Sequence, residues 1–152
     1  MKRNKLIFIL PLAIMTAIFL LSSQNSIQSG SLSQKLTNII IDGIGHLIGP
    51  NISEIPGIGN TMHILVRKAA HFFIYMLLGF FLYMSIRTIV KKAIFLTGSI
   101  CLAFAVSDEI HQFFVPGRSM QIIDVGIDIT GAMAGITIAF LIYRLKQRIS
   151  SS

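Results

Sequence analysis

Acidic residues are concentrated in one short stretch of the chain, which holds four of the six Asp and Glu residues. They are Asp108, Glu109, Asp124 and Asp128. His111 and Gln112 stand among them. Histidine titrates near neutral pH, and beside carboxylates it can act as a general acid or base. The stretch directly follows an apolar run, so the elements that hold it decide what these side chains can do.

A second polar group contains Arg67, Lys68 and His71, and Arg118 lies between the two pairs of acids. An arginine guanidinium offers a planar fork of donors that suits phosphate. Histidine and carboxylates can also ligate a divalent metal. The chain has neither an HExxH motif nor a cysteine pair, and the nearby cations oppose a metal. We therefore expect no metal or other cofactor, and whether the site is catalytic stays open.

The composition excludes an ordinary soluble domain, because 53% of the 152 residues are hydrophobic and only 12% are charged. Soluble domains carry about a quarter charged residues. The net charge of +7 does not indicate nucleic-acid binding, because most basic residues stand at the ends of apolar runs. The length fits a single domain over residues 1–152. The single cysteine, Cys101, indicates no redox chemistry.

Four apolar runs predict an all-α membrane protein with four transmembrane helices. The expected spans cover residues 6–23, 62–87, 92–115 and 122–143. Apolar residues at helical spacing predict an additional amphipathic helix over about 31–48, lying on the outer interface. A Pro- and Gly-rich loop follows at 50–60. The first run also resembles a signal peptide, but its length and the lack of an A-x-A site favour an uncleaved anchor.

The basic residues predict the orientation in the membrane. With the N-terminus inside, nine basic residues face the cytoplasm and four face outward. The inner set is Lys2, Arg3, Lys5, Arg87, Lys91, Lys92, Arg144, Lys146 and Arg148, and the outer set is Lys35, Arg67, Lys68 and Arg118. Both termini are therefore expected in the cytoplasm.

Ionisable residues in three of the expected spans lie at one depth. His71, Asp108 and Asp128 are each 16 residues from the basic residue that ends their span, at Arg87, Lys92 and Arg144 respectively. At the helical rise, that places each of them ~24 Å above the inner border. The end of the first span, at Ser22, Ser23 and Gln24, reaches a similar height.

Helical spacing also predicts that the polar stripes face one another rather than lipid. On the fourth span the stripe continues into Gly131 and Gly135, which allow close helix packing. Ionised groups in the hydrocarbon cost about 2.5–3.5 kcal/mol each, which favours one shared site open to the outer face. We expect a pocket built by spans two, three and four. The candidate catalytic residues are His71, Asp108, Glu109, His111 and Asp128; the candidate binding residues are Arg67, Lys68, Gln112, Arg118 and Asp124. A structural ion-pair network is the alternative.

These motifs resemble those of the VanZ-like family of small bacterial membrane proteins. The matching segments are "LLSSQ", "RKAAHFFIYMLLG" and "SDEIHQFFVPGRSMQIIDVGIDITGA". The family includes proteins linked to resistance to the glycopeptide antibiotic teicoplanin. The resemblance implies a multi-pass protein of the bacterial plasma membrane that acts at the cell envelope, without indicating a reaction.

Three functions remain compatible with the sequence. The protein binds or modifies a membrane lipid, such as a phosphate-bearing envelope lipid or a lipid-linked cell-wall intermediate of the outer leaflet. Alternatively it is a proton-coupled transporter or flippase, which four spans would support only in an oligomer. In the third case it is a non-catalytic accessory membrane protein. An effect on teicoplanin susceptibility is compatible with each of these.

Overall fold

The computed structural model describes residues 5–48 and 55–150, and within these ranges every regular element is helical. The elements are a 3-10 turn η1 (Lys5–Phe8), α1 (Ile9–Ser22), α2 (Ser26–Ile48), α3 (Ile58–Ile86), α4 (Ala93–Phe113) and α5 (Ile122–Ser150). The expected cytoplasmic Lys2 and Arg3, and most of the first half of the expected loop at 50–60, lie outside the described residues.

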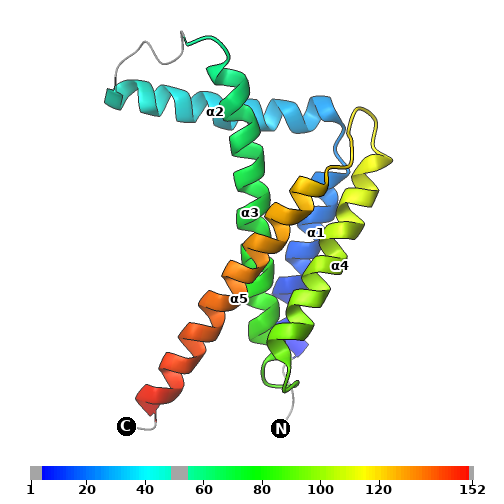
Figure 1. Ribbon diagram of the computed structural model, residues 1–152, viewed down its shortest axis with the longest axis vertical. Helices are drawn as coiled ribbons and strands as arrows, with labels where there is room; N and C mark the ends of the chain where they lie inside the picture. Colours follow the sequence, from blue (N-terminus) through cyan, green and yellow to red (C-terminus); the bar gives the residue numbers. More distant parts are fainter. Residues whose placement is uncertain (1–4, 49–54, 151–152) are drawn as a thin grey trace.

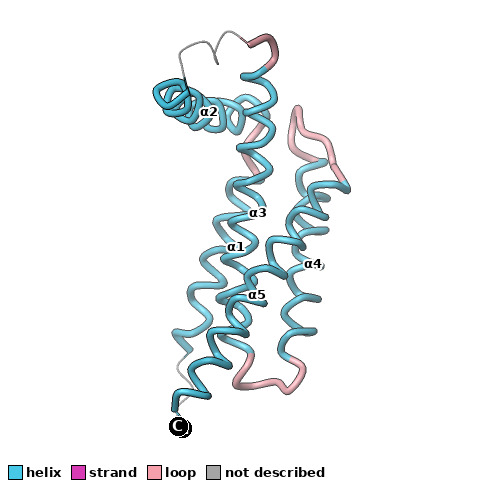
Figure 2. The backbone as a smooth tube through the Cα atoms, turned by 60° about the vertical axis from the view of Figure 1, so that its left-hand side comes forward, coloured by secondary structure: helices cyan, strands magenta, loops and turns pink. Residues whose placement is uncertain are grey.

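Four helices run side by side, and α2 lies across one end of them (Figure 1). The start of η1 and the end of α5 lie at the opposite end, and a turned view shows α2 nearly end-on across the top of the bundle (Figure 2). We call these the α2 end and the terminal end. This arrangement matches the predicted membrane bundle with an additional crosswise helix.

Three helices, α3, α4 and α5, are long and apolar enough to cross a membrane. α1 is a shorter apolar helix of 14 residues, which η1 extends toward the terminal end. The hydroxyl of Ser85 on α3 donates a hydrogen bond to the carbonyl of Ile7 in η1 (2.7 Å). Ile18 and Ser22 of α1 are each only 3% exposed. The first apolar run is therefore an integral part of the packed bundle.

The closest packing in the bundle joins α3 to α5 through glycines. A Cβ at Gly131 would overlap the carbonyl oxygen of Phe72, and one at Gly135 would overlap that of Met76. Gly79 on α3 meets the backbone of Ala132 in the same way. Only glycine allows two helix backbones to approach this closely. The small-residue stripe predicted on the fourth span thus forms what we call the α3–α5 seam.

Three helix boundaries differ from the expected ones by several residues. α2 begins at Ser26 rather than 31, because a short turn after α1 leads directly into a new helix. α5 continues to Ser150 rather than 143, since its basic end consists of residues that favour helix. α3 begins at Ile58, directly after Gly57, whose positive φ of 81° ends the preceding turn. These changes bring α2 closer to α1 and to the polar residues.

Candidate functional site

Asp108 is held between α4 and the end of α1. The hydroxyl of Ser22 donates to Asp108 Oδ2 (2.9 Å), and the Gln112 side-chain amide donates to the same oxygen (3.0 Å). Asp108 is 3% exposed, and its second oxygen, Oδ1, has no hydrogen-bond partner among the described residues. The motif "LLSSQ" therefore places its first serine directly on a candidate site residue.

His71 on α3 meets Asp128 on α5, with 3.2 Å between His71 Nδ1 and Asp128 Oδ1. One ligand atom each of His71, Asp108 and Asp128 lies within 4.8 Å of the others. We call these three residues the buried cluster. Three helices thus bring an ionisable side chain to one point, which is where the equal spacing from the basic borders predicts them. Asp128 is fully buried, and its Oδ2 has no partner within the described ranges.

Asp124 lies one helical turn before Asp128 and pairs with both cations of α3. It forms a close ion pair with Lys68, and its other oxygen is 3.9 Å from Arg67 Nη2. Asp124 is 7% exposed, whereas the side chains of Arg67 and Lys68 are about a third exposed or less. The structural ion-pair interpretation fits these three residues directly.

Arg118 is positioned by a turn between α4 and α5. The amide of Arg118 donates to the carbonyl of Val115 (3.1 Å), and Gly117 has a φ of 76°. Pro followed by a glycine of positive φ is the sequence of a type II turn. The Arg118 guanidinium donates to the carbonyl of Ser22 (3.2 Å) and to Ser29 Oγ (2.9 Å). Pro116 and Gly117 thus form the turn that leads from α4 to Arg118.

Arg118 lacks a close negative partner. No carboxylate in the described part of the chain lies within ion-pair distance of its guanidinium. Burial lowers the pKa of Arg118, Arg67 acts in the same direction, and the more distant acids do not offset this. Among the four acids of the stretch, only Asp124 lies within ion-pair distance of a Lys or Arg in the described part of the chain.

Glu109 and His111 make hydrogen bonds and ring contacts with residues outside the buried cluster. Glu109 is fully buried and accepts a hydrogen bond from the amide of Gln121 (2.9 Å), so it ties α4 to the segment leading into α5. His111 stacks on Phe19 of α1 with ring centroids 4.5 Å apart, and its Nε2 is 3.1 Å from Ser23 Oγ. Glu109 Oε1 has no hydrogen-bond partner among the described residues, and the carboxyl group is close enough to Asp108 and His71 to interact with them electrostatically.

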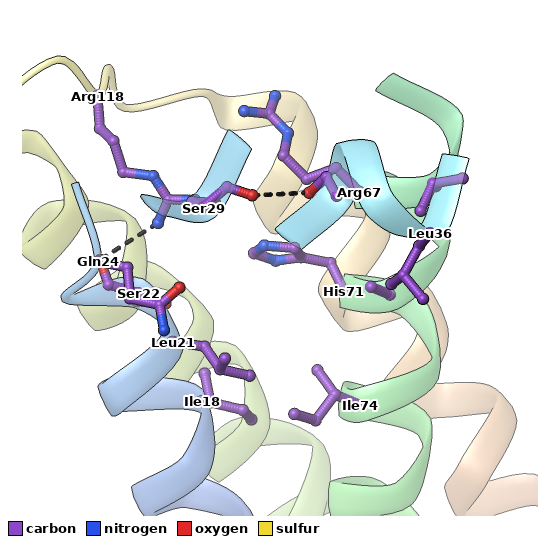
Figure 3. A pocket seen from close by; sticks show the side chains of 13 residues that line it. Ile18, Leu21, Ser22, Gln24, Ser29, Leu36, Arg67, His71, Ile74 and Arg118 are labelled. Atoms are coloured by element: carbon purple, nitrogen blue, oxygen red, sulfur yellow. Dashed lines mark hydrogen bonds between the residues drawn. The ribbon is translucent and has the colours of Figure 1, made fainter. Parts of the chain in front are cut away.

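An amphipathic cavity of about 140 Å³ opens between α1, α2 and α3. Its polar part is formed by Arg67, His71, Arg118 and Ser29, whereas Ile18 and Ile74 face each other in its lower part (Figure 3). The remaining lining residues are Leu21, Ser22, Gln24, Ser33, Leu36, Val66 and Ala70. The cavity therefore offers cations at one end and aliphatic side chains at the other.

A second cavity, of about 220 Å³, is lined by the same two arginines. Arg67, Arg118 and Ser29 line both cavities. The other lining residues of the second one are Gly30, His63, Gln112, Gly117, Ser119, Gln121 and Asp124. Its lining side chains are polar, and the rest of its lining is glycine. The two guanidinium groups thus stand between an amphipathic space and a polar one.

The amphipathic cavity is not where the sequence placed the pocket. We expected spans two, three and four to build it, but its walls come from α1, α2 and α3, with Arg118 as the contribution from beyond α4. The direction of α2 across the bundle causes this difference. Sequence reasoning therefore missed Ser29 and Ser33 as lining residues, and no spacing pattern in the sequence marks them. For Ser22, the only indication from helical spacing was that the end of the first span lies at the same membrane depth as His71, Asp108 and Asp128.

The fold and this site define a small helical membrane protein with a buried polar site at one end of its bundle. The model of the VanZ/LLP1 family matches residues 7–143, so the chain belongs to that family. Searches of curated proteins and of solved structures gave no significant match.

Proposed function

We propose that the protein binds a phosphate-bearing lipid, or a lipid-linked cell-wall intermediate, in the outer leaflet of the bacterial plasma membrane. The observation that carries the proposal is the uncompensated guanidinium of Arg118 beside Arg67, at the polar part of a cavity whose lower part is aliphatic. The same proposal includes modification of the bound lipid, for which His71, a lining residue of the cavity, is the candidate general acid or base.

The charges around the cavity favour an anion. Among the described residues, Lys68 and Arg67 share the carboxylate of Asp124, and Arg118 donates only to neutral oxygens. An arginine pair can hold a phosphate through bidentate hydrogen bonds. A phosphate monoester or diester would supply the missing negative charge. A ligand without a negative charge would leave the positive charges of the two guanidinium groups uncompensated.

The aliphatic part of the cavity favours an acyl or prenyl chain. Ile18 and Leu21 of α1 and Ile74 of α3 line it below the arginines (Figure 3). α2 carries further exposed apolar side chains, including Leu36 and Ile39, which are 45% and 67% exposed. A helix of this kind lies in the membrane interface. A lipid could therefore place its headgroup at the arginines while its chain stays in the bilayer.

The orientation that the proposal requires has α1, α3, α4 and α5 crossing the membrane. Both termini are then cytoplasmic, and α2 lies on the outer surface. The position of the start of η1 and the end of α5 at one end of the bundle and the distribution of basic residues support this arrangement. Accessibility of single introduced cysteines in whole cells, at Lys35 and at Arg148, tests it. Labelling of position 35 alone by an impermeant reagent is the expected result, and labelling of position 148 alone would refute it.

Binding of a short-chain prenyl phosphate to the purified protein in detergent tests the main proposal. The matched prenyl alcohol and inorganic phosphate are the two comparison ligands. We expect the prenyl phosphate to bind at least ~10-fold more tightly than either, since charge-assisted hydrogen bonds contribute about 1.5–3 kcal/mol. Equal binding of the alcohol and the phosphate would refute the role of the arginines.

Arg118→Ala should weaken binding of the prenyl phosphate by ~10-fold or more, whereas Lys35→Ala should leave it unchanged. Lys35 is an exposed cation of α2 that lines neither cavity, so it controls for loss of one positive charge. Unfolding temperatures of both variants show whether the fold is retained. Tight binding by a folded Arg118→Ala protein would contradict the proposal.

Teicoplanin susceptibility provides a cellular test of the same site. If a lipid-linked cell-wall intermediate is the ligand, expression of the wild-type protein should change the inhibitory concentration of teicoplanin, and expression of Arg118→Ala at equal level should not. An equal change with both proteins would show that any effect on the drug does not depend on the arginines.

A further inference from the structure

The buried cluster has a property that the lipid proposal does not explain. Asp108 and Asp128 come from different helices, yet each keeps one oxygen without a hydrogen-bond partner in the described part of the chain. These two carboxylates are 3% and 0% exposed. Unpartnered acceptors this deeply buried are costly. Two carboxylates at this separation also repel each other unless a proton or a cation lies between them.

The surrounding residues orient the carboxylates and leave those two oxygens free. Ser22 and Gln112 hold Asp108 by Oδ2, and His71 holds Asp128 by Oδ1. Asp108 Oδ1 and Asp128 Oδ2 are the remaining oxygens. Partners that bind one atom of a metal ligand and leave the other free are characteristic of metal sites.

A fourth buried group points to the same place from a separate observation. Tyr75 lies one helical turn after His71 and is fully buried. Its hydroxyl has no hydrogen-bond partner within the described residues, and it is close enough to Asp108 and Asp128 to interact electrostatically. A buried phenol without an acceptor or donor indicates that a water or another ligand belongs there.

We propose that His71, Asp108 and Asp128 bind one divalent cation, with one ligand atom from each residue. Two carboxylates and an imidazole suit Mn²⁺ or Zn²⁺. The nearby basic residues repel a bound cation less strongly than their number in the sequence suggests. Asp124 pairs with Arg67 and Lys68, and no Lys or Arg in the described ranges lies within ion-pair distance of Asp108 or Asp128. The two negative charges of the cluster are therefore available to the cation.

Three protein ligands leave coordination positions open for water or for an oxygen of a ligand. His71 belongs to the cluster and also lines the amphipathic cavity, and its ring extends into that space (Figure 3). A phosphate bound by Arg67 and Arg118 could therefore supply one of the open positions. This second part of the inference rests on the proposed function, whereas binding of the cation alone does not.

Titration of the chelator-treated protein with Mn²⁺, followed by electron paramagnetic resonance in lipid-free detergent, tests the inference. We expect one bound ion per chain for the wild type. Asp128→Asn should weaken binding on the order of 100-fold. Asp42→Asn, which removes an exposed acid of α2, should bind as the wild type does. Absence of a bound ion in the wild type, or wild-type affinity in Asp128→Asn, would overturn the proposal.

Two further measurements keep the test decisive if Asp128→Asn does not fold. The wild-type stoichiometry needs no variant, and Asp108→Asn and His71→Gln each remove one ligand from a different helix. A prenyl phosphate titration with and without Mn²⁺ separates this inference from the proposed function. Mn²⁺ binding without lipid binding supports only the cation site. Lipid binding in chelator without any Mn²⁺ binding supports only the lipid site and overturns the cation.

Discussion

The α3–α5 seam and the buried cluster lie on consecutive turns of α3 and α5, with Asp108 of α4 completing the cluster, but the two regions differ in how fully their groups are partnered. At the seam, Gly131 and Gly135 bring the backbones of α3 and α5 together with no space for a methyl group. One turn further toward the α2 end, Asp128 meets His71 through one oxygen and keeps its other buried oxygen without a hydrogen-bond partner among the described residues. The seam is therefore tightly packed, whereas the buried cluster contains polar atoms that lack hydrogen-bond partners among the described residues.

This difference separates what stabilises the fold from what is available to a ligand. Close-packed interiors leave few voids, and the glycines at such a contact serve to let two helix backbones approach each other. Buried polar groups without partners oppose folding, and sites of function are where proteins retain them. Rigid packing at the seam holds α3 and α5 in register, so His71 and Asp128 meet. The seam thus positions the cluster without contributing chemistry.

The largest expected effect is that of Gly135→Ala. The added methyl group would overlap the carbonyl oxygen of Met76, which as backbone cannot move aside easily. Overpacking of this kind destabilises by about 3 kcal/mol. The measurement is the unfolding temperature in detergent. Gly126→Ala is the matched control on the same helix, because nothing lies within 4 Å of a Cβ there. Equal stability of the two variants would contradict the close contact at the seam.

For Asp124→Asn we expect a smaller loss of stability together with a gain in ligand affinity. This change leaves the cations of Arg67 and Lys68 without a carboxylate, which should lower the free energy of unfolding by about 2 kcal/mol, between the values for exposed and buried pairs. The freed cations should at the same time bind the prenyl phosphate more tightly. Denaturant unfolding and ligand titration measure the two effects separately.

Opposite signs for stability and binding are the informative result for Asp124→Asn. A purely structural network predicts loss of stability with no gain in affinity. If ligand binding decreases along with stability, Asp124 itself contacts the ligand, and the assignment of Arg67 as a phosphate partner would have to be revised.

The smallest expected effect is that of Gly117→Ala, in the turn that positions Arg118. Alanine at a φ of 76° costs about 1 kcal/mol. The strain should displace the guanidinium from Ser22 and Ser29, so binding of the prenyl phosphate should decrease more than stability does. Gly59→Ala, in α3 with open space around its Cβ, is the control. Unchanged affinity in Gly117→Ala would show that the turn does not position Arg118.

Local patterns in the sequence were sufficient to predict the helical bundle and the meeting of three residues. Apolar runs end at basic residues, and helical rise is constant, so equal counts from each border place His71, Asp108 and Asp128 at one depth. The stripe of Asp124, Asp128, Gly131 and Gly135 likewise follows from helical periodicity, and all four are buried. The VanZ resemblance was confirmed by the family match.

Only the tertiary structure decided which charges pair and which helices enclose the cavity. Spacing along a helix gives depth and face, but the rotation of one helix against another determines that Asp124 reaches Lys68 while Asp108 reaches Ser22. The path of α2 across the bundle, which brings Ser29 to Arg118, depends on packing between segments far apart in the sequence. Such contacts are set by the shapes of both partners, and no local pattern contains that information.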